Sequence, residues 1–137
     1  MQKKNNRGFT LLELLIALAI LAIIAAIIIP NFFATTDRAR LRSDIASARV
    51  IQNAMELYHA ERGENLAGLD FNIILSRLND ADFITVELAS DTQTEGAVWA
   101  IYGGRVVVDI SGATSDSVHR AYDSLPLAEQ EFVIGRR

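Results

Sequence analysis

Residues that could carry catalytic or metal chemistry are few and widely spaced in this sequence. There is no cysteine, which excludes a thiol nucleophile and a disulfide, and no glycine-rich phosphate loop is present. The two histidines, His59 and His119, are too far apart in sequence to suggest a metal-binding pair. Four acidic residues could in principle gather a calcium ion, but they lack EF-hand spacing: Asp91, Glu95, Asp109 and Asp116. We expect no catalytic residue, cofactor or metal, and hence no enzyme.

One acidic residue is unusual because of its surroundings. Glu13 lies near the start of an apolar stretch, residues 9–33, that is otherwise interrupted only by Thr10 and Asn31. A carboxylate costs about 3 kcal/mol near the centre of a membrane helix on insertion scales, and less near the interface. A helix that only had to cross a membrane gives no reason for this residue.

The apolar stretch has the length of a membrane span. Its 25 residues would extend roughly 37 Å as a helix, and a hydrocarbon core is about 30 Å thick. A secretory signal peptide is a poor alternative, because its apolar region usually has 7 to 15 residues and ends at a small-residue cleavage site. A plain single-pass anchor explains the length and leaves Glu13 unexplained.

Charge is distributed unevenly along the chain. Residues 1–8 contain Lys3, Lys4 and Arg7, and residues 9–137 carry ten basic and 17 acidic residues, net −7. An acidic body disfavours nonspecific nucleic-acid binding, which depends on neutralising phosphates. Both lysines lie within the first eight residues. A chain that lost those residues could not be joined to a neighbour through a lysine isopeptide bond, so any polymer it forms should be noncovalent.

Residues 7–15 read RGFTLLELL, with a glycine before the phenylalanine that opens the apolar stretch and a glutamate four residues after that phenylalanine. This segment resembles the prepilin processing site of type IV pilins and of the pseudopilins of type II secretion. The resemblance covers residues 1–30. It includes the short, eight-residue leader and Pro30, which falls where family members often have a proline.

The resemblance implies a processing pathway. A membrane aspartyl peptidase is expected to cut after Gly8 and to methylate the new amino terminus at Phe9. Glycine suits that position, because it allows close approach of an extended backbone and starts helices weakly. The cut creates an amine one turn from Glu13, and the family expectation is that Glu13 pairs with the Phe9 amine of a neighbouring subunit. Glu13 would then set the axial register of a filament.

The resemblance also implies partners and a location. The expected partners are copies of the chain itself, other pilins, and the prepilin peptidase and methyltransferase. An inner-membrane assembly platform and membrane lipid are expected as well. The leader would lie in the cytoplasm and the body outside, in a single-pass inner-membrane protein that later joins an extracellular pilus or a periplasmic pseudopilus. Charge does not decide this orientation, because three arginines follow the span and equal the leader's basic residues: Arg38, Arg40 and Arg42. These arginines form either a solvated collar or ion pairs with neighbouring subunits.

The rest of the chain reads as a second half of the helix and a small α+β domain. We expect a leader at 1–8, a filament-core helix at 9–33 with a kink at Pro30, and the second half of the helix at 34–62. Its apolar face should comprise Val50, Ile51, Ala54, Met55, Leu57 and Tyr58, and Gly63 should end it.

A variable region is expected at 63–96, with a short helix whose apolar stripe is Phe71, Ile74, Leu75 and Leu78, and then a strand at 83–88. In residues 97–137, strands at 97–102 and 105–110 should pair through Gly103 and Gly104, followed by a helix from 115 or 116 to 124 and a last strand at 132–134. The predicted fold is type IV pilin-like, with the long helix packed against a small antiparallel sheet.

Three roles remain open at this stage. A fibre-forming pilin is favoured modestly, because the chain lacks the Asp-Pro-Trp-Gly-like calcium loop of the major pseudopilin. It also lacks the carboxyl-terminal cysteine pair of many major pilins, so a type II secretion pseudopilin or a minor or competence pilin is the alternative. A membrane-anchored binding module that never polymerises is the third.

Overall fold

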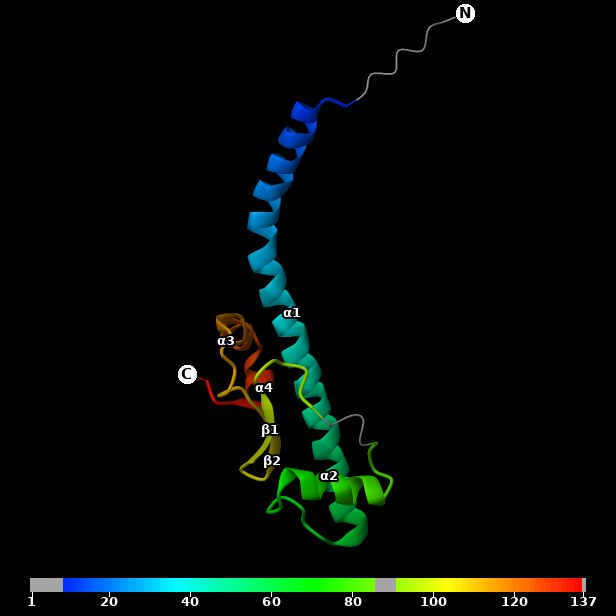
Figure 1. Ribbon diagram of the computed structural model, residues 1–137. Coiled ribbons are helices and arrows are strands. Elements are labelled where there is room, and N and C mark those ends of the chain that lie inside the picture. The colour runs from blue at the N-terminus through cyan, green and yellow to red at the C-terminus, as the bar shows by residue number, and fades with distance from the viewer. Residues whose placement is uncertain (1–8, 86–90, 137) are drawn as a thin grey trace, which may run out of the picture. The chain divides into compact units, whose positions relative to one another are not determined.

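The computed structural model describes residues 9–85 and 91–136, apart from the side chains of residues 30 and 31. The chain divides into two compact units, residues 1–33 and residues 34–137, and each is described by itself. The elements are four helices and three strands within the described residues (Figure 1).

Helix α1 comprises Leu11–Arg62. It includes Pro30, so the helix does not end there, and the kink at that proline stays a prediction. Its end is the predicted one: Gly63 has a φ of 71°, and its amide donates to the carbonyl of His59 at 2.8 Å. Glycine adopts this left-handed conformation without a steric penalty, which makes it a common helix terminator.

In residues 34–62, α1 buries one stripe of side chains at spacings of three and four residues: Leu41, Ile45, Ala48, Ile51, Met55 and Tyr58. The predicted apolar face was too wide at two positions. Val50 is 46% exposed and Leu57 is 57% exposed, because the domain covers only one side of the helix.

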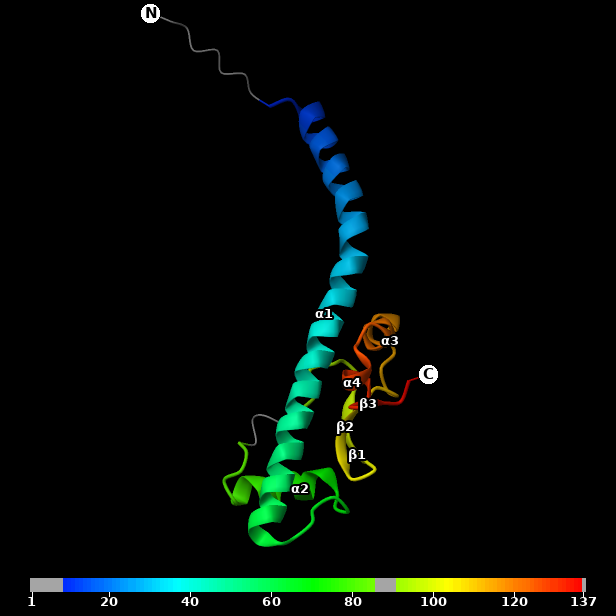
Figure 2. The same ribbon diagram turned by 180° about the vertical axis from the view of Figure 1, so that it is seen from behind.

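Helix α2, Phe71–Asp80, follows the predicted stripe, and Ile74, Leu75 and Leu78 are buried. Asp70 caps its start by accepting from the amide of Asn72 at 2.9 Å. In Figures 1 and 2, α2 lies across the carboxyl-terminal end of α1, and β1 and β2 lie beside the same half of the helix.

The strand predicted at 83–88 is wrong for its first three residues, and residues 86–88 lie outside the described part. The amides of Ala81, Asp82 and Phe83 donate back to carbonyls near the end of α2. Asp82 also has a φ of 61°. These bonds use the backbone to close the helix, so 81–84 form turns and bends, although Ile84 is buried.

The predicted hairpin is confirmed. Strands β1, Val98–Tyr102, and β2, Arg105–Asp109, pair antiparallel, with Tyr102 opposite Arg105. The turn glycines, Gly103 and Gly104, have φ values of 59° and 79°, as a tight type I′ turn requires.

The last strand differs from the prediction in direction. Strand β3, Val133–Ile134, pairs parallel with β2, so the sheet is mixed rather than wholly antiparallel. The physical reason is the connection: the chain passes through α3, Asp116–Asp123, and α4, Leu127–Gln130, before it returns to the sheet. A connection of this length allows a parallel crossover, which a tight turn cannot make.

Helix α3 matches the predicted helix, with Ser115 as its cap, whereas α4 was not predicted. The core forms two clusters, and α1 contributes to both. One contains Ile51, Met55 and residues of α2, and the other contains Leu41, Ile45 and residues of β2 and α3. The α+β class, with a long amino-terminal helix and a small sheet, is confirmed.

Replacing Gly96 by alanine should destabilise this domain by roughly 1–3 kcal/mol. Gly96 has a φ of 76°, and an added Cβ would lie 2.7 Å from the carbonyl oxygen of Gly112. Chemical denaturation of the purified chain measures the change. Gly68→Ala is the matched control, because a Cβ there meets nothing within 4 Å, and equal stabilities of the two variants would contradict this account.

Candidate functional site at the amino-terminal helix

The start of α1 is a capping box built from Thr10 and Glu13. The Thr10 hydroxyl accepts from the amide of Glu13 at 3.2 Å, and the Glu13 carboxylate accepts from the amide of Thr10 at 2.9 Å. The same carboxylate oxygen, Oε2, also accepts from the Thr10 hydroxyl at 3.1 Å. This reciprocal arrangement satisfies amides that an α-helix leaves without partners in its first turn.

The capping box leaves half of the Glu13 carboxylate available. Both bonds from Thr10 go to Oε2, and the structure records no partner for Oε1 among the described residues. Glu13 is exposed, as are Phe9 and Thr10 before it. The carboxylate can therefore keep its bonds to Thr10 and accept another donor.

Thr10 was not singled out in the sequence, although the signal was present. A threonine followed three residues later by a glutamate, just before an apolar run, is the sequence signature of a capping box. Attention to the charge of Glu13 alone missed its local partner.

The structure describes three of the four predicted site residues: Phe9, Glu13 and Pro30. Gly8 lies outside the described residues. Phe9 precedes the helix and its side chain is 84% exposed. Glu13 lies in the first turn of α1, and Pro30 lies within the same helix.

The first unit exposes an almost wholly apolar surface. Every large apolar side chain from Phe9 to Phe33 is exposed by at least 46%. Helix α1 is long and apolar enough to cross a membrane, and none of its apolar segment is buried within the chain. Exposed apolar surface on this scale indicates contact with lipid or with other protein.

The arginines after the apolar stretch bind within the chain. Arg38 donates to the carbonyl of Ser124 at 3.0 Å, Arg42 pairs with Glu129 at 3.1 Å, and Arg40 lies 3.6 Å from Asp37. Arg40 and Arg42 remain 45% exposed, so the solvated collar and the ion pairs with neighbouring subunits both stay predictions. Arg38 and Arg42 tie α1 to the carboxyl-terminal part of the domain, whereas the partner of Arg40 lies on α1 itself.

Two buried carboxylates on α1 were also missed by the sequence reasoning. Asp44 is 2% exposed and accepts from the amides of Gln93 and Thr94 at 2.7 and 2.9 Å. Asp37 is 8% exposed and accepts from the hydroxyl of Ser117. They fasten segments distant in sequence to the helix. No sequence signal identified them, because their partners lie about 50 and 80 residues away along the chain.

Within the described residues, no group of three or more histidine and acidic side chains is arranged to hold a metal ion. Asp91 and Glu95 are exposed side chains before β1, Asp109 ends β2, and Asp116 begins α3. Asp109 accepts from the amide of Ser111 at 2.8 Å, which gives it a local role in the chain.

Comparison with known proteins identifies the amino-terminal segment. A family model described as the prokaryotic N-terminal methylation motif matches residues 3–29. The type II secretion system core protein G of Aeromonas hydrophila is 33% identical over 58 residues, which are 42% of this chain and 41% of that protein.

Two pilins give matches of the same kind. The type IV wide pilus major component PilA4 of Thermus thermophilus is 58% identical over 36 residues, 26% of this chain and 28% of that protein. The type IV major pilin protein PilA of Myxococcus xanthus is 39% identical over 58 residues, 42% of this chain and 26% of that protein.

These matches cover only part of each protein, and the chain spans 41% of the length of the first two curated relatives it matches. No solved structure matches the chain. The matched motif covers the residues that form the capped start of α1 and its apolar surface. The amino-terminal segment of the chain therefore carries the prokaryotic N-terminal methylation motif and is similar to the corresponding segments of type IV pilins and of type II secretion core protein G.

Proposed function

We propose that this chain is a prepilin, a structural subunit that loses residues 1–8, is methylated at Phe9 and then polymerises noncovalently into a type IV pilus-like filament. The observation that carries the proposal is the methylation motif on a capped helix start. The large apolar side chains from Phe9 to Phe33 are exposed there, and Oε1 of Glu13 has no partner among the described residues. This combination supports a helix that first lies in lipid and later packs against copies of itself.

Cleavage after Gly8 is supported by where α1 begins. Phe9 and Thr10 precede the helix, and Phe9 is exposed. A bond next to a nonhelical, accessible residue can enter a peptidase without unwinding a helix. The prepilin peptidase and methyltransferase would act at this bond, with the leader on the cytoplasmic side of the inner membrane.

Assembly would use the new amine at Phe9. In the subunit, Oε2 of Glu13 serves the helix start, and Oε1 remains available for the amine of a neighbouring subunit. An opposite charge stabilises a carboxylate most where water is excluded, as it would be among packed apolar helices. A fixed pairing of this kind would set the axial register between subunits.

Cleavage can be tested by counting amines, because lysine occurs only at positions 3 and 4. The uncut chain has three groups that react with an amine-specific reagent: its amino terminus and the side chains of Lys3 and Lys4. The processed chain should accept at most one label, at the Phe9 amine, which methylation makes a secondary amine, as measured by intact mass after labelling of the unfolded protein. Labelling at several sites in protein recovered from producing cells would contradict processing after Gly8.

The second candidate role is a pseudopilin of a type II secretion system, which the similarity to core protein G favours. The similarity to PilA4 and PilA favours a pilus. Removing the chain from its cell separates the roles. Loss of surface filaments with normal secretion supports the pilus, and accumulation of secreted proteins inside the cell supports the pseudopilus.

A further inference from the structure

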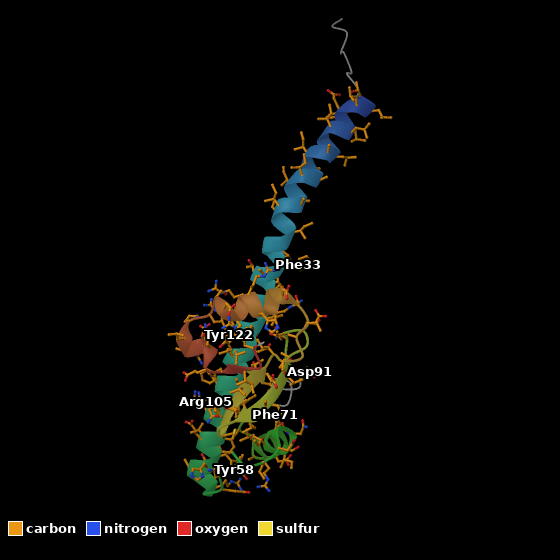
Figure 3. The ribbon with its side chains drawn as sticks, turned by 90° about the vertical axis from the view of Figure 1, so that its left-hand side faces the viewer. Phe33, Tyr58, Phe71, Asp91, Arg105 and Tyr122 are labelled. Carbon is orange, nitrogen blue, oxygen red and sulfur yellow. The ribbon has the colours of Figure 1, made fainter. Side chains whose placement is uncertain are left out.

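The domain carries a small pocket at the start of α2 and the start of β1, which we name the acidic pocket. It has a volume of about 260 Å³ and is lined by Asp70, Phe71, Asn72, Asp91 and Trp99, among others. Phe71 and Trp99 stack, with ring centroids 5.7 Å apart and planes inclined by 24°. Phe71 and Asp91 lie near each other in Figure 3.

Among the described residues, the lining of the acidic pocket carries negative charge and no positive charge. It includes two carboxylates and no basic side chain. One oxygen of Asp70 caps α2, and Asp91 is exposed without a hydrogen bond or ion pair among the described residues. The lining of the acidic pocket therefore suits a cation that can also lie against an aromatic ring.

Among the residues that the structure describes, one arginine is uncommitted and could take this role. Arg62 is exposed in the last turn of α1 and has no hydrogen bond or ion pair among the described residues. The other arginines described by the structure each have an acceptor within the chain: Arg38, Arg40, Arg42, Arg49, Arg77, Arg105, Arg120 and Arg136.

We propose that Arg62 of one subunit enters the acidic pocket of a neighbouring subunit. This inference rests on the proposed polymerisation, since no contact joins Arg62 to Asp70 or Asp91 within one chain. A guanidinium fits the pocket well, because it binds carboxylates through a fork of N–H donors and also stacks on aromatic faces. The processed chain has no lysine, so arginine is its only strongly basic side chain.

Arg62 also has a local role, because a cation near the end of a helix interacts favourably with the helix dipole. A loss of stability in an Arg62 variant would not separate the two roles. The decisive readout is therefore proximity between subunits in assembled filaments.

Cysteine cross-linking provides that readout, because the chain contains no cysteine. In filaments of the Arg62→Cys, Asp91→Cys double variant, mild oxidation should give dimers and higher oligomers on a nonreducing gel, and a reductant should remove them. Arg62→Cys with Asp116→Cys is the matched control and should stay monomeric, because Asp116 lies on α3. Filaments of the first pair that stay monomeric after oxidation would overturn the proposal.

A charge swap covers the case in which the cysteine pair prevents assembly. Arg62→Glu should lower filament yield roughly two- to fivefold, the effect of an exposed ion pair. Adding Asp91→Arg should restore the yield, and absence of restoration would count against the contact. If the unmodified chain forms no filament at all, the proposed function fails instead, so the two failures are distinguishable.

Discussion

Glu13→Ala is expected to remove filaments while leaving the cut after Gly8 intact. The alanine removes the carboxylate that would pair with the amine at Phe9, so each subunit would bring an unpaired cation into an apolar interface. We expect the assembled fraction to fall at least about tenfold, the order of effect when a buried charge loses its partner. Electron microscopy of cells and sedimentation of sheared filaments measure it.

Glu13→Gln separates the charge of this residue from its role in the capping box. Glutamine can also accept from the Thr10 amide, so the start of α1 should persist. The charge is absent, so assembly should fail as it does with alanine. Wild-type filament levels in the glutamine variant would contradict the register role. If Thr10→Ala prevents filament assembly and Glu13→Gln does not, assembly requires the capping box rather than the charge of Glu13.

Asp44→Ala is expected to destabilise the domain by roughly 2–4 kcal/mol, because it leaves the amides of two residues without their acceptor. Asp44 is 2% exposed, and its two oxygens bind the amides of Gln93 and Thr94. A domain of this size has a total stability of about 5–15 kcal/mol, so the loss is large. Chemical denaturation of the full chain in detergent, followed by fluorescence of Trp99, the single tryptophan, measures it.

Two further variants make this test specific. Asp44→Asn keeps one oxygen acceptor, so it should lose less stability than alanine. Glu61→Ala alters an exposed acidic residue of the same helix and should change stability by less than about 0.5 kcal/mol. If the Asp44 and Glu61 alanine variants are equally stable, the Asp44 carboxylate does not hold the segment with Gln93 and Thr94 to α1.

Most of the fold could be predicted from local signals in the sequence. The apolar stretch and Gly63 fixed the extent of α1, and Gly103 and Gly104 identified the hairpin, because each signal acts through nearby backbone geometry. The direction of β3 could not be predicted in this way. It depends on where α3 and α4 return the chain, which is a property of tertiary packing.

Two errors of the sequence prediction, the strand at 83–88 and the width of the apolar face of α1, have different physical origins. Residues 83–85 have strand-like composition, but the amides of Ala81, Asp82 and Phe83 bond back to α2, and this hydrogen bonding outweighed that propensity. Val50 and Leu57 have the spacing of a core face, yet the domain is too narrow to cover them. Sequence periodicity identifies which residues share a helix face, and tertiary packing decides which of them are buried.

The candidate site was predicted in part. Glu13 was singled out from the sequence because a carboxylate is energetically costly in an apolar stretch. Its hydrogen bonds to Thr10 became known only from the structure. The long-range partners of Arg38, Arg42 and Asp44 could not be foreseen, because each lies roughly 50 or more residues away. The acidic pocket is likewise assembled from segments that only folding brings together.

The intact mass of the subunit in purified filaments tests the central proposal most directly. Filaments sheared from producing cells should yield a chain that begins at Phe9 and carries one additional methyl group on its amino terminus. A filament subunit that retains residues 1–8, or that begins at another residue, would contradict the proposed processing. Producing cells that process the chain yet form no filament or pseudopilus containing it would contradict the proposed polymerisation.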